Sequence, residues 1–193
     1  LAQGEAIPQE VLEETGKTVF QGTYQFDQHE YTKAPVKAKT RIGGSGSKLE
    51  SSIQEVLQKC NAHDGMTISF HHHFREGDLV VMQVMNVIHE LGYKDITICA
   101  SSLSKAQDDL VPMIEDGTVT HIETSGVRGK LGEAISEGKL KGIAILRSHG
   151  GRVRAIETGE TKIDIAFIGA PSCDEYGNCR GVGGNSNCGV LSY

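Results

Sequence analysis

The sequence of 193 residues contains no apolar run that approaches the roughly 18 residues of a membrane-spanning helix. Its first residues also lack the basic segment followed by an apolar one that marks a secretory signal. These absences predict a soluble, cytoplasmic protein without a membrane span. Because the chain begins with Leu1 rather than Met, we expect the native N-terminus to lie upstream.

Cysteine and aromatic residues are also scarce. Five cysteines, an odd number scattered along the chain, argue against a disulfide framework. Tryptophan is absent, but the 38% hydrophobic and 23% charged residues are ordinary for a globular protein, which excludes disordered and collagen-like classes. The length suits one domain, or one lobe of a larger protein, with a sizeable core. The net charge of −6 argues against general nucleic-acid binding.

The charge is unevenly distributed. Residues 125–154 carry seven lysines and arginines against two glutamates, a local balance of +5, and 14 of the 24 glycines lie between residues 125 and 193. A basic, glycine-rich stretch in an acidic protein indicates a site for a small anion. A solvated face with flexible turns explains the same composition equally well.

The periodicity of apolar residues divides the chain in two. Residues 1–42 are poorly periodic and are expected to form a leader that packs on a domain spanning residues 43–193. Within that domain the pattern predicts helices at 47–62, 79–91, 110–114 and 131–136, and strands at 66–70, 96–100, 119–122, 143–146 and 163–168. Strands that alternate with helices, without hairpin-type dipeptides, predict an α/β fold with a largely parallel open sheet and flanking helices. Ligands bind such sheets at the carboxyl ends of the strands.

Two glycine-rich loops are candidates for anion binding. The loop Arg41-Ile-Gly-Gly-Ser-Gly-Ser-Lys48 offers the backbone amides of Gly43 and Gly44 just before a predicted helix, but it lacks the Gly-Lys-Ser/Thr of a phosphate-binding P-loop. The second loop begins with Ser125 and Gly126 and lies between a strand and a helix. Its glycine spacing differs from the dinucleotide-binding fingerprint. Flexible turns are the alternative interpretation for both loops.

Three consecutive histidines, His71, His72 and His73, follow the predicted strand 66–70, and Arg75 lies two residues beyond them. In an extended chain the first and third imidazoles share a face and the second points away. Adjacent residues cannot all converge on one tetrahedral ion without distortion, so we expect no metal here. Anion binding or orientation of a carbonyl group is the favoured role.

A basic loop, residues 147–154, follows the predicted strand 143–146. His149 stands beside Gly150 and Gly151, and an imidazole next to unobstructed backbone amides can polarise a thioester or carboxyl carbonyl. Arg152 and Arg154 can each bind a carboxylate through two hydrogen bonds. The loop is therefore predicted to bind and activate a carboxylate or thioester.

The segment after the last predicted strand ends in a turn at Asp174–Asn178, whose Gly and Asn residues suit a purely structural role. Cys173, Cys179 and Cys188 are spaced too irregularly to indicate a zinc site. No Ser-His-Asp triad is recognisable in the sequence.

Taken together, several of these phrases resemble the alpha subunits of citrate lyase: residues 67–75, residues 149–157, residues 163–171 and the turn Asp174-Glu-Tyr-Gly-Asn178. The turn is also similar to an Asp-x-x-Gly-Asn turn of CoA-transferases. The resemblance covers about residues 40–193. It implies a CoA-transferase-like fold, in which residues 43–193 form a first α/β domain that is incomplete at its C-terminus and requires a second half for turnover.

The resemblance also implies a reaction. The alpha subunit exchanges acetate for citrate on the CoA-like thiol of an acyl-carrier (gamma) subunit, or on CoA, and the beta (lyase) subunit then cleaves the citryl thioester. The exchange passes through an acetyl-citryl anhydride without an acyl-enzyme, so we expect Glu157 and Glu160 to balance Arg152 and Arg154 and to stay unmodified. No cofactor is expected to bind directly, and a homo-oligomer is expected.

The residues and the resemblance together assign provisional roles. Catalytic roles fall to His149, Gly150, Gly151 and His72. Substrate-binding roles fall to His71, His73, Arg75, Arg152, Arg154, Gly43, Gly44, Ser125, Gly126 and Asn178. Two alternatives stay open. A sugar-phosphate isomerase of related fold would need a carboxylate base, and a metal-binding regulatory module would use the histidines and cysteines.

Overall fold

The computed structural model describes residues 8–15, 46–71, 79–181 and 183. The chain divides into two compact units, residues 1–32 and 33–193. In the first unit the described part contains the helix α1 (Gln9–Thr15). Within this helix Gln9 Nε2 donates to Glu13 Oε1 at 3.2 Å, one turn along the chain.

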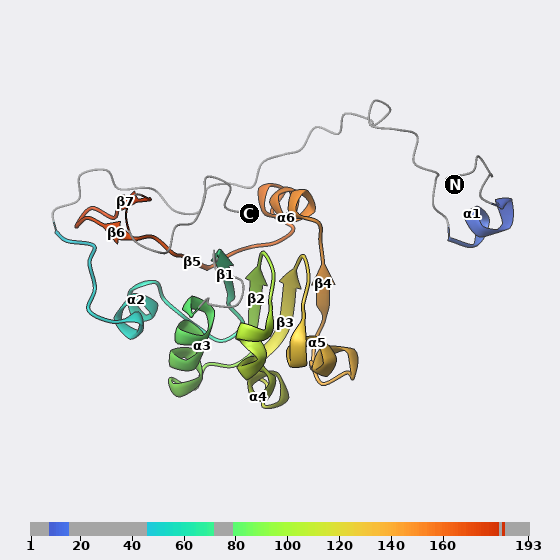
Figure 1. Cartoon of the computed structure of the whole chain (residues 1–193), viewed down its shortest axis with the longest axis horizontal. Coiled ribbons are helices and arrows are strands. Elements are labelled where there is room, and N and C mark those ends of the chain that lie inside the picture. The colour runs from blue at the N-terminus through green and yellow to red at the C-terminus, as the bar shows by residue number, and fades with distance from the viewer. Residues whose placement is uncertain (1–7, 16–45, 72–78, 182, 184–193) are drawn as a thin grey trace, which may run out of the picture. The chain divides into compact units, whose positions relative to one another are not determined.

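The second unit is built on a parallel sheet of five strands: β1 (Thr67–His71), β2 (Ile96–Ala100), β3 (Val119–Thr124), β4 (Ala144–Leu146) and β5 (Ile165–Ile168). Their order is β4-β3-β2-β1-β5, and all four pairings are parallel (Figure 1). The predicted largely parallel α/β fold is thereby confirmed. Two short strands, β6 (Ser172–Cys173) and β7 (Cys179–Arg180), form a separate antiparallel hairpin.

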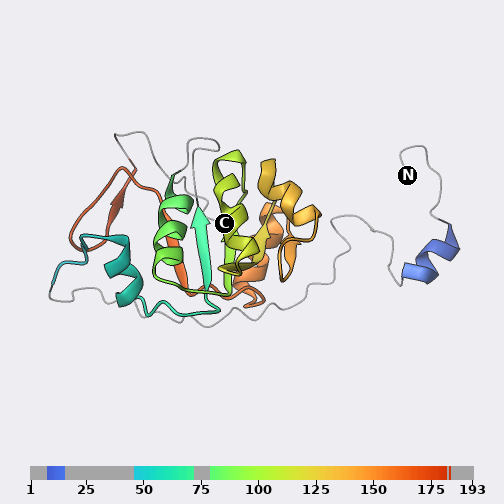
Figure 2. The same cartoon turned by 90° about the horizontal axis from the view of Figure 1, so that it is seen from below.

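One helix of this unit precedes the first strand, and the others connect consecutive strands of the sheet. They are α2 (Ile53–Lys59), α3 (Val80–Glu90), the 3-10 helix η1 (Lys105–Leu110), α4 (Val111–Glu115), α5 (Gly129–Ser136) and α6 (His149–Glu157). Helices α3, α4 and α5 stand in a row beside the sheet (Figures 1 and 2). No described helix has the length and apolar character needed to cross a membrane.

Two predicted segments differ from the structure. The helix expected over 47–62 is shorter, because Ser52 Oγ accepts the Glu55 amide and so starts α2 late. Beyond the C-cap, Asn61 adopts a left-handed conformation with φ of 56° that a helix cannot continue through. The second difference is α6, which replaces most of the loop expected at 147–154.

The two faces of the sheet have different chemistry. On β1, Ile68 and Phe70 are fully buried on the side of α3, and the Phe70 ring stacks on Phe167 with 5.8 Å between centroids. Each such side chain contributes about 1.5–3 kcal/mol through burial. Ser69 alternates with them and therefore points to the opposite face, where its hydroxyl contacts Arg152 of α6. One face thus holds the apolar core, and the other is polar beneath α6.

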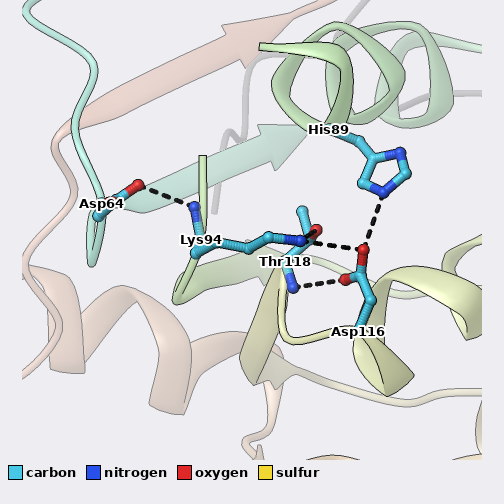
Figure 3. A network of polar contacts seen from close by, with 5 residues as sticks. All are labelled: Asp64, His89, Lys94, Asp116 and Thr118. Atoms are coloured by element: carbon cyan, nitrogen blue, oxygen red, sulfur yellow. Dashed lines mark hydrogen bonds and ion pairs between the residues drawn. The ribbon is translucent and has the colours of Figure 1, made fainter. Parts of the chain in front are cut away.

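A polar network lies at the amino-terminal ends of strands β1 to β3 (Figure 3). The Asp116 carboxylate accepts from His89 Nε2 at 2.8 Å, Lys94 Nζ at 3.0 Å and the Thr118 amide at 2.7 Å. The Lys94 amide also donates to Asp64 at 2.8 Å. Partial burial raises the pKa of Asp116, but these hydrogen bonds outweigh it and hold that pKa well below its usual range.

The network predicts a pH-dependent contribution to stability. Asp116→Asn weakens the hydrogen bonds to the carboxylate, so it should lower the free energy of unfolding near neutral pH. We expect a loss of only about 1 kcal/mol, because Asp116 and its partners Lys94 and His89 are partly exposed to solvent. Since the folded pKa is depressed, the contribution of Asp116 is complete above the unfolded value of about 4 and is lost as the pH falls toward the folded value.

Urea unfolding near pH 7 and at several lower values should therefore show a gap between wild type and variant that narrows below about pH 4. Asp109→Asn, on an exposed acid of η1, is the matched control and should show no such gap. A gap that stays constant with pH would contradict the role of the Asp116 charge.

Candidate functional site

An open pocket of about 750 Å³ lies where β2 and β3 end and α6 begins. The volume lies in the range of small-molecule sites. Its lining comes from three segments: Ser102, Leu103, Ser104 and Lys105 after β2; Ser125, Gly126 and Arg128 after β3; Ser148 and His149 after β4. It occupies the carboxyl edge of the sheet, where parallel α/β proteins bind their ligands.

Main-chain bonds tie the loop after β2 to the loop after β3. The Leu103 amide donates to Gly126 O at 2.9 Å, and the Arg128 amide donates to Leu103 O at 3.1 Å. Ser125 adds two bonds to Ser101 O, one from its amide at 3.2 Å and one from its hydroxyl. The two loops that line the pocket are therefore held together mainly by main-chain hydrogen bonds.

Arg128 is held at the pocket by the start of α5. Gly129 has a φ of +71°, which favours glycine, and a Cβ there would collide with the Asp108 carboxylate. That carboxylate instead accepts the Leu131 amide at 3.2 Å and caps α5. Glycine and aspartate together thus set where the chain turns and where Arg128 is presented.

Helix α6 begins at the pocket. Ser148 is its N-cap, and the serine hydroxyl accepts the Gly151 amide at 3.1 Å. Gly151 therefore completes the cap and does not offer the open amide expected from the sequence. A Cβ at Gly150 would meet nothing within 4 Å, so that part of the turn is accessible. His149 lies in the first turn, next to the positive end of the helix dipole.

The pocket lining carries positive charge and hydroxyl groups. Lys105 and Arg128 are exposed, and neither forms an ion pair with a residue that the structure describes. The lining contains four serines and one histidine but no Asp or Glu among the described residues. Such a lining attracts anions, and its serine hydroxyls are donors for their oxygen atoms.

Arg152, in contrast, is buried beneath α6 with only 3% of its surface exposed. Its Nη2 donates to Ser69 Oγ at 2.8 Å and to Cys99 O at 3.2 Å, which links α6 to β1 and β2. Its Nε and Nη1 are buried without a hydrogen-bond partner among the described residues. Burial raises the pKa of the Cys99 thiol, and the adjacent guanidinium opposes this only in part. Arg152 therefore does not line the pocket.

Arg147 is also engaged within the protein. Its Nη2 lies 2.9 Å from Glu160 Oε1 and its Nε lies 3.5 Å from Glu123 Oε2, which also accepts the Thr161 hydroxyl at 2.6 Å. The Glu160 hydrogen bond is the main cause that raises the pKa of Arg147. Glu160 thus balances Arg147, and not Arg152 or Arg154 as expected from the sequence.

The structure brings three of the predicted site residues together in the pocket, namely Ser125, Gly126 and His149. The other described ones do not line it: His71, Gly150, Gly151, Arg152, Arg154 and Asn178. The remaining residues lie outside the described part of the chain, so their roles stay predictions: Gly43, Gly44, His72, His73 and Arg75.

The segment Ser102–Lys105 was missed by the sequence analysis, although it follows a predicted strand. Three hydroxyls and a lysine directly after the strand 96–100 were the available signal. Within the described ranges, no group of three or more histidine, cysteine or acidic side chains is placed to hold a metal ion.

Comparisons with known proteins agree with one another. The model of the family "Citrate lyase, alpha subunit" matches residues 46–193. The citrate lyase alpha chain of Haemophilus influenzae is 44% identical over 170 residues, which are 88% of this chain and 34% of the relative. That of Escherichia coli is 49% identical over 146 residues, or 76% of this chain and 29% of the relative. The chain thus spans about a third of the length of these relatives.

A solved structure shows the same fold. A crystal structure described as the alpha subunit of citrate lyase from Streptococcus mutans, in complex with citrate, superposes with a TM-score of 0.81 at 45% identity. The match covers 98% of this chain and 36% of that one.

The buried contacts of Arg152 predict that this side chain stabilises the fold. Arg152→Met removes the hydrogen bonds to Ser69 and Cys99, and we expect the free energy of unfolding to fall by about 2 kcal/mol. Arg154→Met, an exposed position two residues along α6, should change it by less than about 0.5 kcal/mol. Urea unfolding followed by circular dichroism measures both, and equal losses would refute the assignment.

Proposed function

Because the chain belongs to the family of citrate lyase alpha subunits, we propose that it forms part of the transferase that exchanges acetate for citrate on an acyl-carrier thioester. The products are a citryl thioester and acetate. The observation that carries this proposal is the basic pocket at the carboxyl edge of the sheet, whose described lining has no acid. Citrate, a trianion at neutral pH, is the ligand that we place there.

The proposed chemistry needs little more than positioning. A citrate carboxylate is itself a nucleophile, so the protein has to hold it against the thioester carbonyl and stabilise the oxyanions that form. A guanidinium can bind one carboxylate through two hydrogen bonds, and an ammonium can neutralise another. Arg128 and Lys105 supply these two groups from different loops. The crystallised Streptococcus mutans relative holds citrate, which supports this choice of ligand.

His149, which lines the pocket, and the adjacent Gly150, whose backbone is accessible beside it, are the groups that we assign to the thioester carbonyl. They lie in the first turn of α6, where backbone amides and the helix dipole favour negative charge. Ser148 fixes this turn by capping the helix, so the donors are in place before the reaction begins. In this proposal the acyl group arrives on the CoA-like arm of an acyl-carrier subunit. A lyase subunit then cleaves the citryl thioester, and the chain itself holds no cofactor.

The two alternative functions find less support. A sugar-phosphate isomerase needs a carboxylate base beside its substrate, and the described lining of the pocket contains none. A metal-binding module needs converging ligands, and none are grouped within the described ranges.

If Arg128 binds a carboxylate of citrate, removing its side chain should weaken citrate binding. In an alpha chain that contains this segment, Arg128→Ala should raise the KM for citrate about tenfold or more, since a charge-assisted contact is lost. The kcat should change much less if Arg128 binds citrate equally in the ground and transition states. The measurement is the steady-state release of acetate from an acetyl carrier thioester as a function of citrate concentration.

Lys130→Ala is the matched control, because Lys130 is exposed on α5 and does not line the pocket. It should leave the KM for citrate unchanged. An unaltered citrate dependence in Arg128→Ala would remove Arg128 from the site. Absence of acetate release in the wild type would overturn the transferase proposal itself.

The anhydride route predicts that no glutamate carries the acyl group. Glu157 and Glu160 are exposed, and Glu160 is paired with Arg147, so neither is placed as a nucleophile at the pocket. Hydroxylamine trapping during turnover, followed by peptide mass spectrometry, should find both unmodified. A hydroxamate at either glutamate would instead establish an acyl-enzyme.

A further inference from the structure

The β6–β7 hairpin places two cysteines directly opposite each other. The strands pair antiparallel, with Ser172 opposite Arg180 and Cys173 opposite Cys179. Both cysteines are exposed, and both are free thiols. The candidate transferase site does not include either residue.

The position of the pair within the ladder matters for its chemistry. The Asp174 amide donates to Asn178 O at 3.0 Å, so the adjacent Asp174–Asn178 pair is a hydrogen-bonded one. Because the two kinds of pair alternate, Cys173 and Cys179 occupy a non-hydrogen-bonded pair, in which Cα atoms approach to about 4.5 Å and side chains leave on one face. A disulfide accepts Cα separations of about 4.4–6.8 Å.

Hydrogen bonds within the turn hold this register, and the Cys179 thiol adds a contact to Gly177 O at 3.9 Å. Asp174 accepts hydrogen bonds from the amides of Tyr176 and Asn178 at 2.9 Å each and from Asn178 Nδ2 at 2.8 Å, which lowers the pKa of Asp174. The Gly177 amide closes the turn onto Asp174 O at 3.0 Å, with a φ of +82° that suits glycine. The two cysteines are therefore held opposite each other in the ladder while both thiols are reduced.

We propose that Cys173 and Cys179 form a redox-active dithiol that closes to a disulfide by exchange with a small-molecule disulfide such as glutathione disulfide. The thiolate of one cysteine attacks a sulfur of glutathione disulfide, breaks its S–S bond and releases one glutathione thiolate. The thiolate of the other cysteine attacks the resulting mixed disulfide, forms the intrachain S–S bond and releases the second glutathione. Two electrons and two protons leave the cysteine pair and appear in two molecules of reduced glutathione.

The other thiols of the chain are placed differently. Cys99 is buried in β2, where burial raises the pKa of its thiol and protects it from exchange. Cys60 is exposed at the end of α2, and its thiol faces no cysteine across a paired strand. Cys188 lies outside the described residues, and the experiment must therefore distinguish it as a partner.

The test equilibrates the 193-residue chain in mixtures of reduced and oxidised glutathione. Free thiols are then trapped with N-ethylmaleimide, and the chain is digested with trypsin without reduction. Cleavage after Lys162 and Arg180 places both cysteines of the pair in one peptide, residues 163–180, apart from Cys60, Cys99 and Cys188. We expect this peptide to lose both maleimide adducts and to be lighter by two hydrogen atoms than its reduced form.

A shifted pair supplies the control for geometry. The double substitution Cys179→Ser with Arg180→Cys moves the second thiol one residue along β7, onto the opposite face of the hairpin. Its equilibrium constant for closure, read from intact mass after trapping, should be at least about tenfold lower than in the wild type. In concentrated urea, where the register is lost, the two constants should become similar. Cys188→Ser should close as the wild type does.

Three results would each overturn the proposal. The first is a disulfide between the peptides 163–180 and 181–193, which would make Cys188 the partner. The second is the accumulation of glutathione adducts on the cysteine pair without an intrachain bond. The third is equal closure constants for the wild type and the shifted variant in native buffer.

Discussion

All five strands of the main sheet run in the same direction, so every strand leaves the sheet at the same edge. The loops after β2, β3 and β4 are forced to meet there, although they are separated by many residues in sequence. Hydrogen bonds between neighbouring loops, such as that from the Leu103 amide to Gly126 O, then fix the loops against each other. The candidate site is a consequence of this parallel pairing.

Charged side chains are arranged differently at the two ends of the strands. At the edge where β2 and β3 begin, Asp116 gathers three donors and compensates the charge of Lys94. At the edge where they end, Lys105 and Arg128 stand at the pocket without a described acidic partner. Uncompensated positive charge in a pocket raises the local concentration of anions.

The polar face of the sheet explains why α6 matters for the site. Most helices of the unit cover the apolar face, where Phe70 and its neighbours form the core. Helix α6 is held on the other face by Arg152, which reaches Ser69 and the Cys99 carbonyl, and by the burial of Ala155. A buried guanidinium is costly to leave unpaired, so these contacts fix the helix that carries His149 to the pocket.

Much of the fold could be predicted from local patterns. The apolar run 96–100 forms β2 as expected, and the absence of hairpin signals between the main strands indicated the parallel sheet. The loop containing Ser125 and Gly126 was identified because glycine and serine follow a strand there. These features depend on short stretches of sequence, in which the alternation or run of apolar side chains fixes the burial of the backbone.

Tertiary structure decided what depends on neighbours distant in sequence. The segment beginning His149-Gly-Gly reads as a loop because of its two glycines, and it becomes α6 through the Ser148 cap and the burial of Arg152 against two strands. The lysine and serines after β2 become a site only because β2 lies beside β3. Local sequence specifies a residue's chemistry and its conformational preference, but strand order and register determine which other residues it meets.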